Sequence, residues 1–295
     1  MKARKRFREL AEADEILVLP GAYDALSAKI VEAAGFQGVY LTGYGQSASK
    51  LGKPDVGLMS MAEMVERTRD MTMAVDIPVA CDADTGFGNT VNVVRTVQEY
   101  ERAGAAAIQL EDQQMPKKCG HMLGRTVIPA EEMAMKIDAA VKARTDPDFM
   151  IIARTDTRTS FGIEEAIKRG HLYKEAGADI IFIESLESVE EMKRINKEID
   201  SLTIANMVEG GRTPYLTAKE LEEIGYNMVV FPVSTLYAAT KAVYDVLANI
   251  KISGKVSDDY FKKLINFTDF NEFIGLKEIR SIEANDLSAI RKKFT

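Results

Sequence analysis

Short apolar runs alternate along this chain with longer segments whose apolar residues recur at helical spacing. The short runs are rich in Val, Ile, Leu and Ala, which is the composition of strands buried on both faces of a parallel sheet. Eight such strands are predicted, at residues 16–20, 38–42, 78–84, 106–111, 149–155, 179–184, 202–207 and 228–233. Seven helices are predicted between them, at residues 25–34, 62–74, 91–103, 130–143, 163–176, 189–197 and 218–224.

The order of these elements predicts an α/β fold in which eight parallel strands close into a (β/α)8 TIM barrel. The repeating units run from residue 16 to residue 233, and such barrels are usually about 250 residues long. A doubly wound sheet is the alternative, but it usually has fewer strands. No Gly/Ser-rich or Pro-rich linker interrupts the chain. We therefore predict one barrel domain over residues 1–295, which ends in a helical segment at residues 235–295.

One motif points to a different fold. Segment 43–48, Gly-Tyr-Gly-Gln-Ser-Ala, matches a dinucleotide-binding fingerprint and follows a predicted strand. In a nucleotide-binding fold a helix begins at that point and continues. Gly52, Pro54 and Gly57 interrupt this segment instead, so we do not expect a dinucleotide site.

Composition and charge narrow the class of partner. The chain is 46% hydrophobic and carries a net charge of −7, whereas nucleic-acid binding requires a basic face. No apolar run is long enough to span a membrane, and the first residues lack the apolar core of a signal peptide. The two cysteines, Cys81 and Cys119, suit a reducing compartment. We expect a cytoplasmic protein that binds a small molecule and neither nucleic acid nor membrane.

Ionisable or hydrogen-bonding side chains lie at the ends of most predicted strands. They are Thr42, Asp82, Asp84, Glu111, Asp112, Arg154, Asp156, Glu184 and Asn206. Active sites of TIM barrels gather at the C-terminal ends of the strands, so these polar ends predict a site. Asp112 and Asp156 are the two for which a helix cap or a turn is the alternative.

The acids in this set predict a metal site. Asp82 and Asp84 are two residues apart on one predicted strand, so both carboxylates should point to the same face. Glu111 ends the next strand, and Asp55 lies in the loop after the second strand. Carboxylates held together repel unless a proton or cation lies between them. Oxygen ligands favour Mg²⁺ or Mn²⁺ over Zn²⁺, and Mg²⁺ keeps several waters.

The loop after Glu111 carries Lys117, Lys118, Cys119 and His121. A thiol beside cations is expected to have a lowered pKa, with Lys117 holding its charge. If the loop closes over the site, Cys119 can supply a proton to a carbanion left by C–C cleavage. A solvated basic loop with an unused cysteine is the alternative.

Five segments resemble the isocitrate lyase and phosphoenolpyruvate mutase superfamily. The most specific is the signature Lys-Lys-Cys-Gly-His at residues 117–121. The others follow in the order of the superfamily: Asp-Ala-Asp-Thr-Gly-Phe-Gly at 82–88, Glu-Asp-Gln at 111–113, Ala-Arg-Thr-Asp at 153–156 and Ala-Asn-Met at 205–207. The resemblance covers nearly the whole chain and implies a TIM barrel.

The resemblance implies a role for each candidate residue. The implied metal ligands, binding Mg²⁺ directly or through water, are Asp82, Asp84, Glu111 and, nearby, Asp55. The implied substrate contacts are Thr42, Gly43, Tyr44, Gly120, Arg154, Glu184 and Asn206. The implied catalytic residues are Cys119, Tyr40, Arg154, Lys117 and His121. Cys119 would protonate the departing enolate-like carboxylate, and Tyr40 is the candidate for taking the proton of the substrate hydroxyl.

The resemblance also implies a reaction. Cys119 argues against the phosphonomutase branch, which lacks the signature cysteine. Segments 209–214 and 271–273 resemble the dimethylmalate lyase branch. We therefore expect Mg²⁺-dependent cleavage of a 2-methylmalate-type dicarboxylate, preferably 2,3-dimethylmalate, to pyruvate and propionate. Val208 replaces the threonine of methylisocitrate lyases and removes a partner for a second distal carboxylate, although Arg212 could compensate. Cleavage of 2-methylisocitrate to pyruvate and succinate stays the alternative.

Three further functions are weaker alternatives. Oxaloacetate hydrolases of this branch carry a serine where this chain has Pro232, which disfavours that activity. The second alternative is a Schiff-base aldolase that uses Lys117. The third is a non-catalytic barrel that binds oxo acids. In quaternary structure the resemblance implies a homotetramer whose last barrel helix is exchanged between subunits. The apolar tail at residues 261–274 would be exchanged or would pack on its own barrel.

Overall fold

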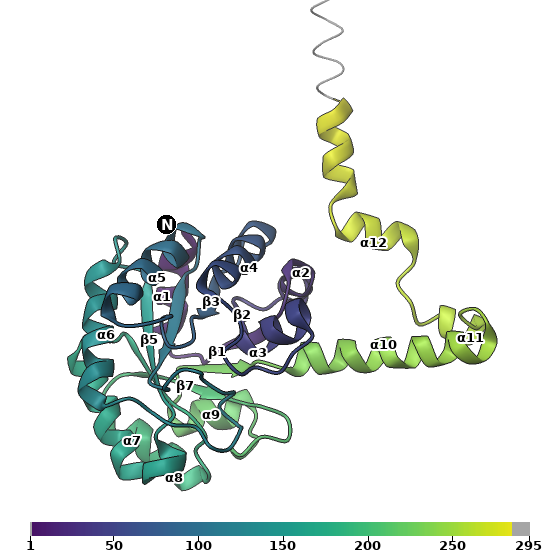
Figure 1. The fold of residues 1–295 in the computed structure, drawn as a ribbon. Coiled ribbons are helices and arrows are strands. Elements are labelled where there is room, and N and C mark those ends of the chain that lie inside the picture. The colour runs from purple at the N-terminus through teal and green to yellow at the C-terminus, as the bar shows by residue number, and fades with distance from the viewer. Residues whose placement is uncertain (1, 285–295) are drawn as a thin grey trace, which may run out of the picture. The chain divides into compact units, whose positions relative to one another are not determined.

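The computed structural model describes residues 2–284, and its strands form one closed barrel in chain order (Figure 1). The strands are β1 Leu17–Ala22, β2 Val39–Leu41, β3 Val79–Asp82, β4 Ala107–Glu111, β5 Met150–Thr155, β6 Ile180–Ile183, β7 Leu202–Asn206 and β8 Met228–Phe231. Every neighbouring pair is parallel, and β8 closes the barrel by pairing with β1. Each strand overlaps its predicted range. The TIM barrel is therefore confirmed, and the doubly wound alternative is excluded.

Helices alternate with the strands and surround them in Figure 1. In the barrel unit they are α1 Lys2–Ala11, α2 Ala25–Ala33, α3 Gly43–Gln46, the π-helix η1 Ser47–Leu51, α4 Met61–Ala74, α5 Thr90–Arg102, α6 Ala130–Ala143, α7 Arg158–Glu175, α8 Val189–Glu198 and α9 Ala218–Ile224. Local sequence explains where several of them begin and end. Thr217 and Glu220 form a capping box at the start of α9, and Gly225, with φ of 107°, ends it in the left-handed region.

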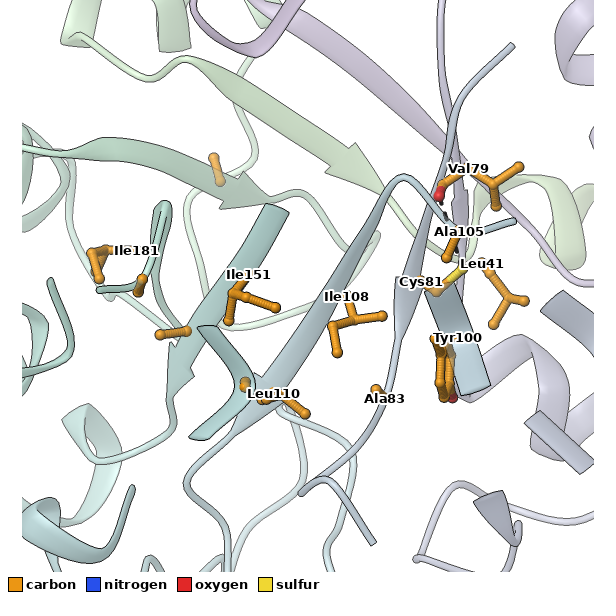
Figure 2. Packing of buried hydrophobic residues seen from close by; sticks show 14 of the residues in the cluster. Leu41, Val79, Cys81, Ala83, Tyr100, Ala105, Ile108, Leu110, Ile151 and Ile181 are labelled. Carbon is orange, nitrogen blue, oxygen red and sulfur yellow. Dashed lines mark hydrogen bonds between the residues drawn. The ribbon is translucent and has the colours of Figure 1, made fainter. Parts of the chain in front are cut away.

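Two apolar layers hold the barrel together, because successive side chains of a strand point to opposite faces. The outward-facing residues, such as Leu41, Cys81 and Ile108, pack against the surrounding helices (Figure 2). The inward-facing residues, such as Tyr40 and Ile152, fill the interior of the barrel. Cys81 is fully buried in the outer layer and acts as a small apolar residue.

Helix α1 packs at the end of the barrel where the strands begin. The helix is amphipathic: Phe7 and Ala11 are fully buried and belong to the inner layer, while the other residues of α1 are exposed or half-buried. Arg4 donates to the carbonyl of Ala105, just before β4. Arg8 donates to Asp179, just before β6. The helix thus covers the end opposite to the one where polar side chains gather.

From Ala238 onward the chain belongs to a second compact unit. Its helices are the remainder of α10 Ser234–Ser253, then α11 Asp258–Phe261 and α12 Phe267–Phe273. In the described part of the chain, these three helices contain no buried residue. Large apolar side chains are exposed along them: Val243, Tyr244, Leu247, Ile250, Phe261, Leu264 and Phe267. Within residues 2–284, no helix is both long and apolar enough to cross a membrane.

Candidate active site

A cavity of about 240 Å³ is lined by residues at the C-terminal ends of the barrel strands and by the loops that follow them. Drug-sized ligand sites are usually about 300–1,000 Å³, so this cavity suits a small acid. Most of the predicted site residues line it: Tyr40, Thr42, Tyr44, Asp55, Asp82, Glu111, Lys117, Cys119, Gly120, His121, Arg154, Glu184 and Asn206. The structure therefore brings together the strand ends and the signature loop, as the sequence predicted.

The two remaining candidates lie directly behind the lining. Gly43 approaches Asp82 so closely that a Cβ at this position would collide with the carboxylate. Asp84 is buried and contacts Lys117. Asp82 and Asp84 were expected to share one face of a strand, and this is wrong. The strand β3 ends at Asp82, and Asp84 adopts a left-handed φ of 48°. A turn brings the two acids together, and the backbone N–H of Asp84 donates to Asp82 Oδ1 at 2.9 Å.

Lys117 joins two of the acids in a buried ion pair. Its Nζ lies 2.7 Å from Asp55 Oδ1 and 2.5 Å from Asp84 Oδ1, and all three side chains are almost fully buried. Burial lowers the pKa of Lys117, but the charges of Asp84 and Asp55 outweigh it and hold that pKa well above its usual value. Burial also raises the pKa of Asp84, to about 6. Lys117 therefore neutralises carboxylates, and the expectation that it holds the charge of Cys119 is wrong.

The acids fit a hard metal ion that keeps water in its coordination sphere. Glu111 Oε1 is buried and has no hydrogen-bond partner among residues 2–284, and burial raises the pKa of Glu111 well above its usual value. Both features favour a cation beside this carboxylate. In the described part of the chain, no three His, Cys, Asp or Glu side chains converge closely enough to hold an ion by themselves. Bound Mg²⁺ would then be completed by water and substrate oxygens, as is usual for this ion.

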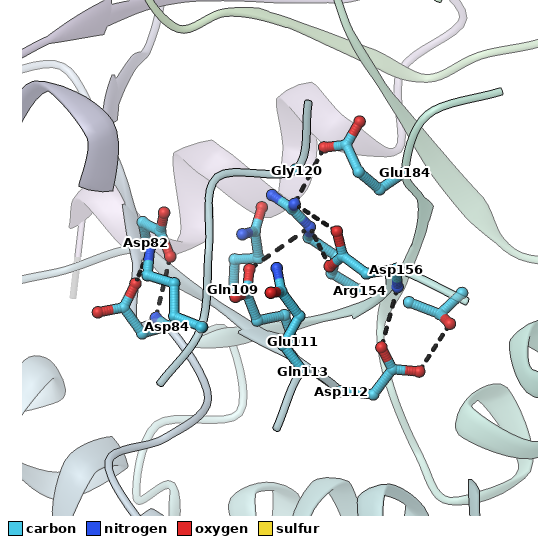
Figure 3. Close-up of polar contacts among 12 residues, drawn as sticks. Asp82, Asp84, Gln109, Glu111, Asp112, Gln113, Gly120, Arg154, Asp156 and Glu184 are labelled. Carbon is cyan, nitrogen blue, oxygen red and sulfur yellow. Dashed lines mark hydrogen bonds and ion pairs between the residues drawn. The ribbon is translucent and has the colours of Figure 1, made fainter. Parts of the chain in front are cut away.

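Arg154 stands on the other side of the cavity within a group of three acids (Figure 3). Its guanidinium makes two hydrogen bonds of 2.9 Å to Asp156 and lies 3.2 Å from Glu184 Oε2. It also lies 3.5 Å from Glu111 Oε2, and it stacks over the ring of Phe182. A guanidinium fixed on so many sides presents its charge to the cavity in one orientation.

Asp112 and Asp156 are buried and take part in a network of hydrogen bonds and ion pairs. The alternative interpretation, that they are helix caps or turn residues, is therefore wrong. Burial raises the pKa of Asp156, but Arg154 and Arg125 outweigh it and hold the pKa below its usual value. Asp112 accepts hydrogen bonds from Thr155 Oγ1, the backbone N–H of Asp156 and three further donors: Tyr173 Oη, Arg169 Nη1 and, through its backbone carbonyl, Ile128 N. Asp112 thereby fixes the turn that carries Asp156 and, through it, Arg154.

The signature loop is fastened over the cavity at several points. The backbone N–H of Cys119 donates to the carbonyl of Asp55 at 3.1 Å. Ser185 Oγ donates to the carbonyl of Gly120 at 2.8 Å. A Cβ at Gly120 would collide with Arg154 and Glu184, so only glycine lets the loop come this close. Cys119 consequently lines the same cavity as the acids.

Burial raises the pKa of the Cys119 thiol to about 11. The expected lowered pKa is wrong, because the two lysines beside the thiol in sequence are engaged elsewhere. Lys117 pairs with Asp55 and Asp84, and Lys118 Nζ donates to the carbonyl of Gly124. Cys119 is therefore a neutral thiol near pH 7, the state from which a proton can be given.

His121 connects the signature loop to the loop after β7. Its Nδ1 accepts a hydrogen bond of 3.1 Å from the backbone N–H of Arg212, and burial lowers the pKa of the imidazole. The ring is then neutral with its proton on Nε2, which lies 3.6 Å from Glu184 Oε1. A Cβ at Gly211 would press on the imidazole at 2.8 Å, so glycine is required at this contact.

Several lining residues were not predicted from the sequence. They are Gln109, Met122, Phe182, Glu209, Gly210, Gly211, Val230, Val233 and Tyr237. One of them had a visible signal. Gln109 is the one polar residue inside the apolar run 106–110, two positions before Glu111, and therefore on the same face of its strand.

Comparison with known proteins identifies what this arrangement is similar to. The family model for phosphoenolpyruvate phosphomutase matches residues 7–251. The 2,3-dimethylmalate lyase of Eubacterium barkeri is 55% identical over 285 residues, which are 97% of this chain and 98% of that protein. The 2-methylisocitrate lyase of Aeropyrum pernix is 47% identical and is matched over 94% of this chain and 89% of its own.

A solved structure shows a ligand and a metal in this fold. The structure of a phosphonopyruvate hydrolase in complex with oxalate and Mg²⁺ superimposes with a TM-score of 0.88 at 32% identity. The match covers 97% of this chain and all of that chain.

Proposed function

This chain belongs to the phosphoenolpyruvate phosphomutase family and is a carbon–carbon lyase, and from that premise we propose that it cleaves the C2–C3 bond of 2,3-dimethylmalate to pyruvate and propionate. The observation that carries the proposal is the shared cavity, which Cys119 lines together with the carboxylates and Arg154. A 2,3-dimethylmalate lyase also stands among the relatives, at 55% identity.

The charged residues would bind and orient the substrate. Arg154 is held by Asp156 so that its charge faces the cavity, and it would contact an oxygen of the oxo-acid part. The backbone N–H groups at the start of α3, beginning at Gly43, have no partner within their own helix and suit a carboxylate. Mg²⁺ or Mn²⁺ held by Asp82, Asp84 and Glu111, with Asp55 nearby, would stabilise negative charge on the substrate oxygens as a Lewis acid.

The proposed reaction moves one proton out of the substrate and one into a product. Loss of the C2 hydroxyl proton to a base, for which Tyr40 is the sequence-based candidate, turns the C–O bond into the carbonyl of pyruvate. The C2–C3 bond breaks, and its electron pair passes to C3 of the departing acid. Cys119 gives its thiol proton to C3, and propionate leaves. The thiolate is then reprotonated from solvent or from the base.

Part of the cavity lining supports the smaller leaving acid. Val208, Pro232 and Val233 line the cavity, and none of these side chains can pair with a second carboxylate. Arg212, the residue that could have compensated, points its guanidinium at Glu187, with Nη2 2.6 Å from Oε1. An unpaired buried carboxylate is costly, so succinate is a poorer leaving acid here than propionate.

We expect kcat/KM for 2,3-dimethylmalate to exceed that for 2-methylisocitrate by at least about tenfold. The measurement is initial rates with coupled pyruvate detection in the presence of Mg²⁺, and EDTA should abolish both activities. The second candidate function is 2-methylisocitrate lyase, which the Aeropyrum pernix relative favours. A preference for 2-methylisocitrate would assign the chain to it.

A Schiff-base aldolase is disfavoured by the ion pairs of Lys117. An amine attacks a carbonyl only when it is unprotonated, and Asp55 and Asp84 stabilise the ammonium form. Borohydride trapping in the presence of substrate should leave the protein mass unchanged. A pyruvate adduct on Lys117 would overturn the proposed mechanism.

We propose further that the chain forms a homotetramer in which residues 235–295 pack against a neighbouring subunit, as an exchanged element. The support is the row of exposed apolar side chains on α10, among them Val243 and Leu247, which are 54% and 56% exposed. An apolar helix without a buried face is expected to find a partner. The cytoplasmic location predicted from the cysteines stays a prediction.

Replacing Leu247 by glutamate should lower the molar mass of the assembly, because a carboxylate would be buried at the contact. Light scattering coupled to size-exclusion chromatography measures that mass for the full chain. Lys241→Glu is the matched control and should leave a tetramer, because Lys241 is exposed and lies on a different side of α10 from Val243 and Leu247. A wild-type monomer would contradict the proposal, as would a Leu247→Glu variant of unchanged mass.

A further inference from the structure

Gln109 lies at the floor of the cavity, deeper in the barrel than Glu111. It is fully buried, and it points inward because it shares a strand face with Ala107 and Glu111. Its neighbours on the floor include the rings of Tyr40 and Phe182. Figure 3 shows its amide between the Asp82 side of the site and Arg154. A substrate that enters this cavity would meet the amide at its inner end.

One hydrogen bond determines which way the amide faces. Tyr40 Oη donates to Gln109 Oε1 at 2.8 Å, so Nε2 is turned away from Tyr40. The surrounding charges favour the same orientation. Asp82 is the register partner of Gln109 on β3, and Glu111 follows it on β4, so a flipped amide would place its oxygen among carboxylates.

The amide nitrogen of Gln109 is a buried hydrogen-bond donor without an acceptor among the described residues. Gln109 Nε2 has no hydrogen-bond partner among residues 2–284. An unpaired buried donor destabilises a fold, and an apolar residue of similar shape would avoid this cost. A donor fixed by Tyr40 and directed at a ligand cavity is explained when the ligand supplies an oxygen.

We propose that Gln109 is a substrate-binding residue whose Nε2 donates to an oxygen of the oxo-acid part, and that Tyr40 is the positioning residue that orients it. The proposal rests on the proposed function only in taking a pyruvate-type oxo acid as the ligand class. It gives Tyr40 a part different from that of a base, because the Tyr40 hydroxyl proton is already donated to Gln109. The oxo-acid part is then held by a charged donor, Arg154, and by a neutral one on the adjacent strand.

The test replaces the amide by an isosteric side chain without a donor, Gln109→Met. Oxalate serves as the probe of the oxo-acid site, and its dissociation constant is measured by calorimetry in the presence of Mg²⁺. We expect binding to weaken about ten- to a hundredfold, the loss of one buried hydrogen bond. For whichever alkylmalate is turned over, kcat/KM should fall by a similar factor.

A matched control exists elsewhere in the barrel unit. Gln46 is also fully buried, its Oε1 accepts from Arg67 Nε at 2.8 Å, and its Nε2 likewise lacks a partner among residues 2–284. It does not line the cavity. Gln46→Met should lower the urea midpoint of unfolding and leave the oxalate dissociation constant unchanged. The pair separates loss of a ligand contact from a general loss of stability.

A double-mutant cycle decides the part played by Tyr40. If Tyr40 acts through Gln109, Tyr40→Phe weakens oxalate binding in the wild-type background and costs less than about twofold in the Gln109→Met background. An equal loss of kcat in both backgrounds would show that Tyr40 acts independently, as a base would, and would overturn the positioning role. Unchanged oxalate binding in Gln109→Met would overturn the proposal as a whole. Oxalate binding that depends on Gln109, without turnover of any alkylmalate, would refute the proposed function alone.

Discussion

Replacing Cys119 by serine should lower kcat for the preferred alkylmalate about 10²–10⁴-fold, the usual contribution of a positioned proton donor. Serine keeps the size of the side chain, but its hydroxyl is a far weaker acid than a thiol. Because Cys119 is not assigned to binding, the dissociation constant of oxalate in Mg²⁺ should change little. The measurements are steady-state pyruvate release and calorimetry on the same preparations.

Cys81→Ser is the control for loss of a thiol. Cys81 is fully buried in the layer between strands and helices, and it does not line the cavity. Its replacement should lower the unfolding midpoint while kcat stays within a few-fold of wild type. A Cys119→Ser enzyme that keeps more than a tenth of its kcat would refute the assignment of Cys119 as the acid.

Replacing Lys117 by methionine should lower the free energy of unfolding by about 3–5 kcal/mol, the cost of removing one partner of a buried ion pair. The change leaves Asp55 and Asp84 buried side by side without the ammonium that lies within 2.7 Å of each. Urea unfolding followed by circular dichroism measures the effect. Lys118→Met is the matched control, because Lys118 is half-buried and its ammonium contacts only a carbonyl, so its loss should cost less than about 1 kcal/mol.

The loss of unfolding free energy in the Lys117→Met variant should depend on pH and on added metal. Burial already raises the pKa of Asp84, to about 6, and without Lys117 this folded-state pKa should rise further. A carboxyl with a raised folded-state pKa costs stability when it is ionised. The loss of stability should therefore begin to shrink as the pH falls through this raised pKa, which lies above 6 in the variant. Added Mg²⁺ should stabilise the variant more than the wild type if these acids bind the ion. A variant as stable as wild type at pH 8 would show that the ion pair does not support the fold.

The arrangement of strands and helices could be read from the sequence because it depends on local periodicity. Runs such as 149–155 are apolar on both faces, and each is followed by a segment of helical period. Only a parallel sheet covered by helices buries both faces of eight such strands. The candidate site followed from the same regularity, since Glu111, Arg154 and Glu184 each end a strand, and all strand ends meet at one edge of a barrel.

What each charged group contacts was decided by the tertiary structure. Lys117 is two residues from Cys119 in sequence but pairs with Asp55 and Asp84, which come from other loops. Lys117 therefore does not pair with the thiol, and burial raises the pKa of the thiol, where a lowered pKa was expected.

The contacts of Gln109, Tyr40 and Asp156 likewise could not be predicted from the sequence. The sequence placed Asp156 at a strand end, but its two arginine partners are Arg154, on the strand that Asp156 follows, and Arg125, from the loop after β4. Tyr40 and Gln109 lie 69 positions apart, and only closure of the barrel joins them. Sequence alone determined which faces are apolar and where polar groups end the strands, because burial of a face is a local pattern. Partners, orientations and pKa directions depend on distances of a few ångströms between segments far apart in the chain, and these exist only in the folded barrel.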